Sequence, residues 1–168
     1  MADDKDVPGE RTATASEQLL TFVVDGEEYG VDILRVQEIR GWSPPMPIPN
    51  TPAFIKGVIN IRGDIVPIAD LRERLGLARL EAGATTAVVV LRVSQGSRHR
   101  VMGIVVDAMS DVTNVPIDQI RTPPEFGEGA AQRGLARAIA TLADKMVTIL
   151  DVDKVFALPA AGAVAGVA

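Results

Sequence analysis

The sequence predicts an all-β fold of two small closed barrels. The first observation behind this prediction is an internal repeat, because the pattern of residues 50–77, NTPAFIKGVINIRGDIVPIADLRERLGL, returns at an offset of 81 in residues 142–158, LADKMVTILDVDKVFAL. In both copies an apolar strand ends at a tight turn, a second strand follows, and an Asp opens a short amphipathic helix. The second observation is that the expected strands are short and the turns frequent. Closed barrels suit such strands because closure removes the unpaired edges.

The repeat extends over both halves of the chain at two offsets. At an offset of 81 the matched pairs are Ile61 with Leu142, Ile65 with Met146, Val66 with Val147, Ile68 with Ile149, Asp70 with Asp151, Leu71 with Val152 and Leu75 with Phe156. At an offset of 73 they are Gly30 with Gly103, Val31 with Ile104, Val36 with Met109, Glu38 with Asp111 and Ile39 with Val112.

The chain of 168 residues is long enough for one substantial core or two small linked ones, and the repeat favours two. We expect a folded region over residues 17–158, with halves of about 17–78 and 84–158. Residues 1–16 and 159–168 are expected to be flexible tails. The start of the chain lacks the basic region and apolar core of a signal peptide. The apolar stretch 157–168 is shorter than the roughly 20 residues that span a bilayer.

Each element of the first half has its own local signal. Residues 19–24 alternate as a strand does, and Asp25-Gly26 is a strong hairpin turn because Gly tolerates a positive φ. Residues 27–32 return as a strand. Residues 33–36 lack alternation and predict a helical turn, before a short strand at 37–40.

Prolines and an acidic helix cap define the elements that follow. Residues 42–52 hold five of the eleven prolines, which predicts a surface loop. Residues 57–62 and 65–69 predict a hairpin about Gly63-Asp64. Asp70 is a good N-cap for a helix at 71–75, which Gly76 ends.

The second half begins after a junction at residues 77–85. Residues 86–93 and 101–106 are apolar strands joined by the polar turn SQGSRHR. Residues 121–134 form a long Pro, Gly and Glu loop, and 135–142 with 146–150 repeat the earlier hairpin.

Composition excludes several classes of function. Lys and Arg total 17 against 22 Asp and Glu, a formal net charge of -5, which argues against a nucleic-acid binder because such proteins need a basic face. The absence of Cys excludes disulfides, thiolate metal sites and a Cys nucleophile, and it fits a reducing cytosol. The one histidine, His99, allows neither a multi-histidine metal site nor more than one member of a catalytic triad, and we place it at an exposed hairpin tip.

Other candidates for chemistry have structural explanations. Asp107 with Asp111, and Asp151 with Asp153, are paired carboxylates, but Asp151 matches the helix cap Asp70 and Asp153 suits the helix dipole. The Gly-rich loop lacks the Lys-Ser/Thr ending of a phosphate cradle. The sequence therefore predicts no catalytic residues, no metal and no cofactor. Glu38 and Arg62 stand out, and from the pattern alone they are most simply two solvated surface charges.

Four segments read together change that interpretation. VDILRVQEIRG, PNTPAFIKGVINIRGDIVPIADLRERLGL, VMGIVVDAMSDV and DKMVTILDVDKVF resemble the CheW family of bacterial chemotaxis coupling proteins, and the PAFIKGVINIRG run is highly specific. The resemblance spans about residues 17–158. It implies two SH3-like, five-stranded β-barrel subdomains with short helices, and strands near 19–32 that complete the barrel built by the other half. Two loops, PPMPIPN and EFGEGAAQRG, are the visible departure and are candidates for tuning the choice of partner.

The resemblance also implies a function and a site. The family is a non-enzymatic cytoplasmic scaffold that links the signalling tip of methyl-accepting chemoreceptors to the regulatory domain of the CheA histidine kinase, in membrane-associated arrays reached through these partners. Contacts with other copies of the chain stay open. The positions that match the family's receptor groove between the barrels are Val36, Glu38, Gly57, Asn60 and Arg62. We expect Glu38 and Arg62 to face each other there, and the kinase surface to lie on the opposite side of a barrel.

Three alternatives remain at this point. A coupling protein of a non-motility chemosensory pathway would have the same sequence features, since the partner determines the output. A small enzyme with a loop-borne site is opposed by the single His and the missing Cys. A nucleic-acid-binding pair of barrels is opposed by the acidic balance.

Overall fold

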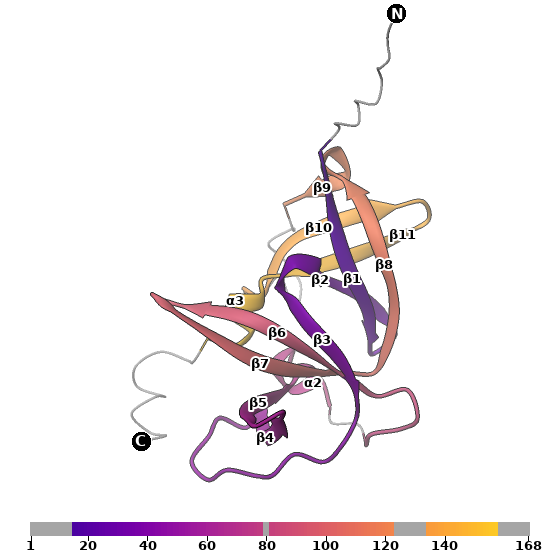
Figure 1. Cartoon of the computed structure of the whole chain (residues 1–168). Helices are drawn as coiled ribbons and strands as arrows, with labels where there is room; N and C mark the ends of the chain where they lie inside the picture. Colours follow the sequence, from indigo (N-terminus) through magenta and orange to yellow (C-terminus); the bar gives the residue numbers. More distant parts are fainter. Residues whose placement is uncertain (1–14, 79–80, 123–133, 158–168) are drawn as a thin grey trace, which may run out of the picture.

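The chain folds into two curled β-sheets that lie against each other (Figure 1). The computed structural model describes residues 15–78, 81–122 and 134–157. One sheet has six strands in the order β8-β1-β2-β11-β10-β9, and the other has five in the order β3-β6-β7-β5-β4. The all-β prediction with two barrel-like units is confirmed. One sheet gains a sixth strand over the expected five, and that strand, β9, has only two residues.

The six-stranded sheet combines the two ends of the described chain. Its strands are β1 (Ser16–Val24), β2 (Glu27–Asp32), β8 (Ala108–Pro116), β9 (Ile120–Arg121), β10 (Ala136–Leu142) and β11 (Lys145–Leu150). β2 pairs with β11 in parallel, and all other pairs are antiparallel. Most of the two expected tails, and residues 123–133 of the long loop, lie outside the described residues, while Ser16 already belongs to β1.

The five-stranded sheet takes the middle of the chain. Its strands are β3 (Val36–Gly41), β4 (Ile55–Ile61), β5 (Asp64–Asp70), β6 (Ala87–Gln95) and β7 (Arg98–Val106). The 3₁₀ turn η1 (Ile33–Arg35) precedes β3, and η2 (Ile117–Gln119) precedes β9. The β4–β5 turn sits at Arg62 and Gly63, both with positive φ, one residue earlier than expected.

The repeat seen in the sequence is also a repeat of structure. β5 pairs in parallel with β7 at Ile68 and Gly103, and β11 pairs in parallel with β2 at Ile149 and Gly30. These two pairs are related by the offsets of 81 and 73. Each sheet therefore joins the first hairpin of one copy to the second hairpin of the other copy. The two sheets do not coincide with the two halves of the sequence.

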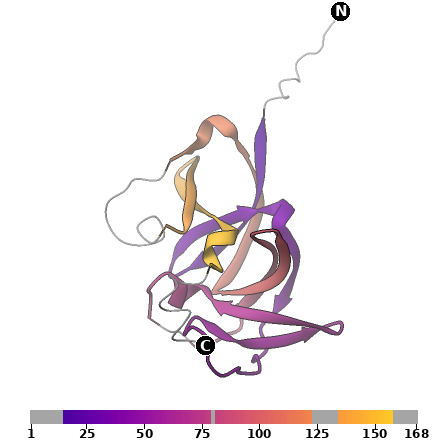
Figure 2. The ribbon, with the colours of Figure 1, turned by 90° about the vertical axis from the view of Figure 1, so that its left-hand side faces the viewer.

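Two short helices occupy matching places after the second hairpins. Asp70 caps α2 (Leu71–Arg74) by accepting a 2.9 Å hydrogen bond from the Arg72 N–H, and Asp151 caps α3 (Val152–Val155) by accepting one from the Asp153 N–H at 3.1 Å. Both caps were predicted, because an Asp before an apolar turn satisfies otherwise unpaired backbone donors. Figure 2 shows α3 between the two sheets.

The main core lies between the sheets and draws on both. Its largest fully buried members include Phe22 and Val31 from the six-stranded sheet, Leu91 and Ile104 from the five-stranded sheet, and Phe156 after α3. Smaller clusters fill the interior of each curled sheet. Residues 87–91 of β6 are buried on both faces, which explains their continuous apolar run in place of alternation.

A charged cluster around α2 ties the sheets together at one junction. Arg72 donates from Nε to Asp107 Oδ1 at 3.0 Å and from Nη2 to Asp107 Oδ2 at 3.0 Å, and it also reaches Asp25 at the β1–β2 turn. Burial favours the neutral form of Asp107, but hydrogen bonds from Arg72 and from the Asp25 N–H outweigh it, so the pKa of Asp107 is lowered.

A second charged junction lies around α3, which corresponds to α2 in the repeat, and here the helix carries the negative charge. The position 81 residues after Arg72 is Asp153, which forms an ion pair with Arg35 of η1 and accepts a 2.7 Å hydrogen bond from the Ser94 N–H of β6. In the first junction the helix supplies the cation, and in the second it supplies the anion. Two of the carboxylates that the sequence analysis considered as candidates for chemistry, Asp107 and Asp153, therefore each form an ion pair with an Arg and have a structural role.

Candidate partner-binding surface

Glu38 is the centre of a small charged network on the five-stranded sheet. Its carboxylate accepts hydrogen bonds from Arg40 Nη1 at 3.0 Å and from Arg62 Nη2 at 2.5 Å. Hydrogen bonds from Arg62 and then Arg40 lower the pKa of Glu38, and the same contact raises the pKa of Arg62. The contact expected between Glu38 and Arg62 is therefore present. The Arg62 side chain remains 67% exposed, so it keeps room to meet a partner.

The β4–β5 turn presents Arg62. Arg62 and Gly63 both have positive φ, and the Asn60 side chain accepts a 2.9 Å hydrogen bond from the Gly63 N–H. Ala143 occupies the matching turn of the second copy with a similar positive φ of 45° against 51° for Arg62. The same turn geometry thus carries a guanidinium in one copy and only a methyl group in the other.

Gly57 has a different task, which is to let the proline-rich loop cross β4. Met46 pairs with Val58 through two backbone hydrogen bonds of 2.8 and 2.9 Å. A Cβ on Gly57 would lie 2.2 Å from the Met46 carbonyl oxygen, and Gly57 has a φ of 147°. Only glycine fits this close approach without strain. Residues 42–52 form the expected surface loop, with this single bridge to the outer edge of β4.

Val36 lies at the start of β3, where the register against β6 shifts between Val36 and Glu38. It is half-buried and packs against the core between the sheets. The five predicted residues therefore share one sheet and its turn. Glu38, Asn60 and Arg62 are linked through the turn, while Gly57 and Val36 stand at other points of β4 and β3.

Sequence reasoning missed Arg40, the second partner of Glu38. The signal was available, since Arg40 follows Glu38 by two positions on one strand and side chains two apart share a face. It also missed the cations of both junctions, Arg72 and Arg35. Their carboxylate partners lie 35 and 118 residues away, so no local pattern marks them.

The candidates for other chemistry sit in structural roles. His99 lies on β7 near the hairpin end, is exposed, and has Nδ1 at 3.3 Å from the Ser94 Oγ. Within residues 15–78, 81–122 and 134–157, no group of His, Cys, Asp and Glu side chains is arranged to hold a metal ion. In the same ranges, no helix has the length and apolarity to cross a membrane.

The sequence and the fold of the chain were compared with those of known proteins. The CheW-like domain family matches residues 18–160. The chain is similar to the chemotaxis protein CheW of Klebsiella aerogenes, with 44% identity over 84% of this chain and 82% of the relative. It is also similar to the chemotaxis protein CheW of Rhizobium meliloti, at 36% identity over 83% and 86%. Among solved structures, the scaffolding protein TtCheW of Thermoanaerobacter tengcongensis matches with a TM-score of 0.77 and 28% identity, covering 86% of this chain and 94% of that one.

Proposed function

The chain belongs to the CheW family, and from this premise we propose that it is a non-enzymatic coupling protein linking the cytoplasmic signalling tip of chemoreceptors to the regulatory domain of the CheA histidine kinase. The observation that carries the proposal is the match of one family over residues 18–160, which is nearly the whole described chain. The protein would work in the cytoplasm and reach receptor arrays through these partners.

The network around Glu38 supports the receptor part of the proposal. In a helix-in-groove contact, which we propose for the receptor, a helix is held by apolar contact area together with charges that fix its register. Arg62 offers an exposed guanidinium whose position is fixed by Glu38 and by the Asn60 turn. We propose that the receptor-binding set consists of Val36, Glu38, Gly57, Asn60 and Arg62. Gly57 contributes indirectly, because it allows the proline-rich loop to cross β4.

Exposed apolar side chains occur on both sheets, and one of them, Ile65, lies directly opposite Asn60 in the β4–β5 pair. Ile65 on β5 is 62% exposed and Met146 on β11 is 61% exposed, at matching positions of the two repeats. Met146 lies on the other sheet, so exposed apolar area is present both beside the network around Glu38 and away from its sheet. The kinase contact is expected away from the network around Glu38.

The test is reconstitution with purified components. The protein is titrated with a receptor cytoplasmic fragment and, separately, with the kinase regulatory domain, and kinase autophosphorylation is measured with each combination of the three proteins. We expect binding to both partners and a rise in autophosphorylation that requires the receptor fragment and this protein together.

Binding to neither partner at micromolar concentration would refute the coupling function for this chain. Binding to the kinase domain without binding to the receptor fragment would refute the receptor-binding set alone. The two failures are therefore distinguishable.

A further inference from the structure

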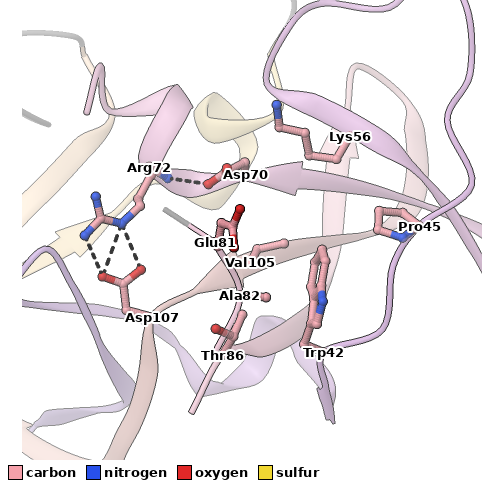
Figure 3. Close-up of a pocket in the computed structure, with 10 residues that line it drawn as sticks. All are labelled: Trp42, Pro45, Lys56, Asp70, Arg72, Glu81, Ala82, Thr86, Val105 and Asp107. Carbon is pink, nitrogen blue, oxygen red and sulfur yellow. Dashed lines mark hydrogen bonds and ion pairs between the residues drawn. The ribbon is translucent and has the colours of Figure 1, made fainter. Parts of the chain in front are cut away.

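A pocket of about 410 Å³ lies apart from the network around Glu38 (Figure 3). Its walls come from the start of the proline-rich loop, from β4, from the β5–α2 junction, from the end of β7 and from residues 81–86 before β6. Strands distant in sequence thus build one cavity next to the Arg72–Asp107 junction. None of the five proposed receptor-binding residues lines it.

The two cations of the pocket are already engaged. Arg72 donates through Nε and Nη2 to Asp107, through Nη2 to Asp25 as well, and through Nη1 to the Ala78 carbonyl at 2.9 Å. Lys56 forms an ion pair with Glu73. An anionic ligand would have to displace one of these pairs, so the pocket is poorly suited to anions.

Two carboxylates of the pocket form no ion pair with its cations. Asp70 accepts the Arg72 backbone N–H, and within the described residues neither Asp70 nor Glu81 forms an ion pair. Burial, and after it the nearby charge of Glu73, raises the pKa of Asp70, while hydrogen bonds from the Arg72 and Glu73 N–H groups and the charge of Lys56 oppose this shift only in part. Both carboxylates line the same cavity, and Figure 3 shows Glu81 below Asp70 and beside Val105.

Part of the remaining wall is apolar. Trp42, Pro45 and Val105 contribute a flat aromatic ring and aliphatic surface facing the cavity. Such a wall matches the methylene stem of a long cationic side chain, while a guanidinium or ammonium group is attracted both to carboxylates and to an indole face.

We propose that this pocket is a second binding site, one that takes an arginine or lysine side chain presented by a partner protein. The stem lies along Trp42 and Pro45, and the cationic group meets Asp70 and Glu81. Since Arg72 and Asp107 form part of the wall, the bound side chain also touches the junction between the sheets. The proposal does not depend on the receptor and kinase assignments above.

The single tryptophan of the chain, Trp42, provides the readout. The full chain is titrated at about 0.15 M salt, which screens long-range attraction, with N-acetyl-arginine amide, N-acetyl-lysine amide and the uncharged isostere N-acetyl-citrulline amide. We expect saturable changes of Trp42 fluorescence with the two cations and about tenfold weaker binding of citrulline, because charge-assisted hydrogen bonds are the strong ones.

Asp70→Asn is the decisive variant, since Asn keeps the helix cap and removes the charge. It should weaken arginine binding about fivefold to tenfold, as should Glu81→Gln, while the matched control Asp118→Asn on η2 should bind like the original chain. Absence of saturation, equal binding of citrulline, or unchanged affinity in both pocket variants would overturn the proposal. An equal loss in Asp118→Asn would show a general charge effect and would overturn it too.

Discussion

At the scale of single residues, Arg62 is expected to contribute to receptor binding and little to the stability of the fold. Its guanidinium is largely exposed and contacts Glu38, so Arg62→Glu should leave the melting temperature nearly unchanged and weaken receptor binding roughly thirtyfold, as loss of a central charged anchor does. Kinase binding should survive. Adding Glu38→Arg should restore part of the affinity if the two charges mainly orient each other. An unchanged receptor affinity in a folded Arg62→Glu protein would remove Arg62 from the site.

Gly57 should show the opposite behaviour, a loss of stability. An Ala there would place its Cβ 2.2 Å from the Met46 carbonyl oxygen in a strained backbone conformation, so Gly57→Ala should cost about 2 kcal/mol or more. Faster hydrogen exchange of the Val58 amide, which bonds Met46, would locate the damage at the loop. Gly41→Ala has open space around it and should stay within about 0.5 kcal/mol. Equal stability of the two variants would contradict this role.

The raised pKa of Asp70 predicts how the stability of the folded chain changes with pH. Burial raises its pKa in the folded chain above the ordinary value of 3.8, so ionised Asp70 opposes folding at neutral pH and this cost fades as pH falls through the folded pKa. Asp70→Asn should thus be at least as stable as the original chain at pH 7, and the two should converge below pH 3.8. Asp70→Ala should lose about 1 kcal/mol with the cap. Melting curves of the three proteins measured over a range of pH test this prediction. If Asp70→Asn were less stable than the original chain at pH 7, the conclusion that ionised Asp70 opposes folding would be wrong.

At the scale of elements, the two charge-reversed junctions fix how α2 and α3 join the sheets. The Arg72 side chain is only 12% exposed, and its planar guanidinium group donates two hydrogen bonds to Asp107. Arg72→Ala should therefore lower the free energy of unfolding by about 1 to 3 kcal/mol. Arg72→Lys should recover only part of this loss, because an ammonium group lacks the planar pair of donors. Arg137→Ala, which breaks a more exposed pair with Glu17, should cost about 1 kcal/mol or less. Denaturant unfolding compares the three variants.

The same junction gives a second pH signature. The pKa of Asp107 is lowered when folded, so its stabilising contribution is present above the unfolded pKa and is lost as pH falls through the folded pKa. The stability difference between the original chain and Arg72→Ala should therefore shrink in strong acid. A difference that is constant with pH would show that packing of the Arg72 stem, and not its charge, is responsible.

At the scale of the whole molecule, the exchange of hairpins makes each sequence half dependent on the other. β1 and β2 pair with β8 and β11, while β6 and β7 pair with β3 and β5. Residues 1–78 and 79–168 expressed separately should each be unfolded, because each lacks the partners of its first or second hairpin, and mixing them should restore the circular dichroism of the intact chain. A cooperative melting transition in either half alone would contradict this dependence.

Much of the local structure followed from the sequence because its causes are local. The Asp70 and Asp151 caps, the hairpin turn near Gly63 and the strand at residues 19–24 each rest on the chemistry of adjacent residues. The alternation expected in that strand does not appear as alternating burial, because residues 19–22 are all buried. The family resemblance added Glu38 and Arg62 as a pair. The turn shifted by one residue because Arg62 itself takes a positive φ, which is uncommon for a side chain of that size.

Tertiary structure alone decided the partners. Alternation marks which face of a strand is buried but not which strand lies beside it, so the parallel pairs of Gly30 with Ile149 and of Gly103 with Ile68 appear only in the fold. The cations of the two junctions and the pocket beside Trp42 depend in the same way on residues far apart in the chain. The repeated unit and its caps follow directly from the order of the amino acids, because turns and caps depend on residues only a few positions apart. The exchange between the copies was set by burial of the shared core, which no single segment contains.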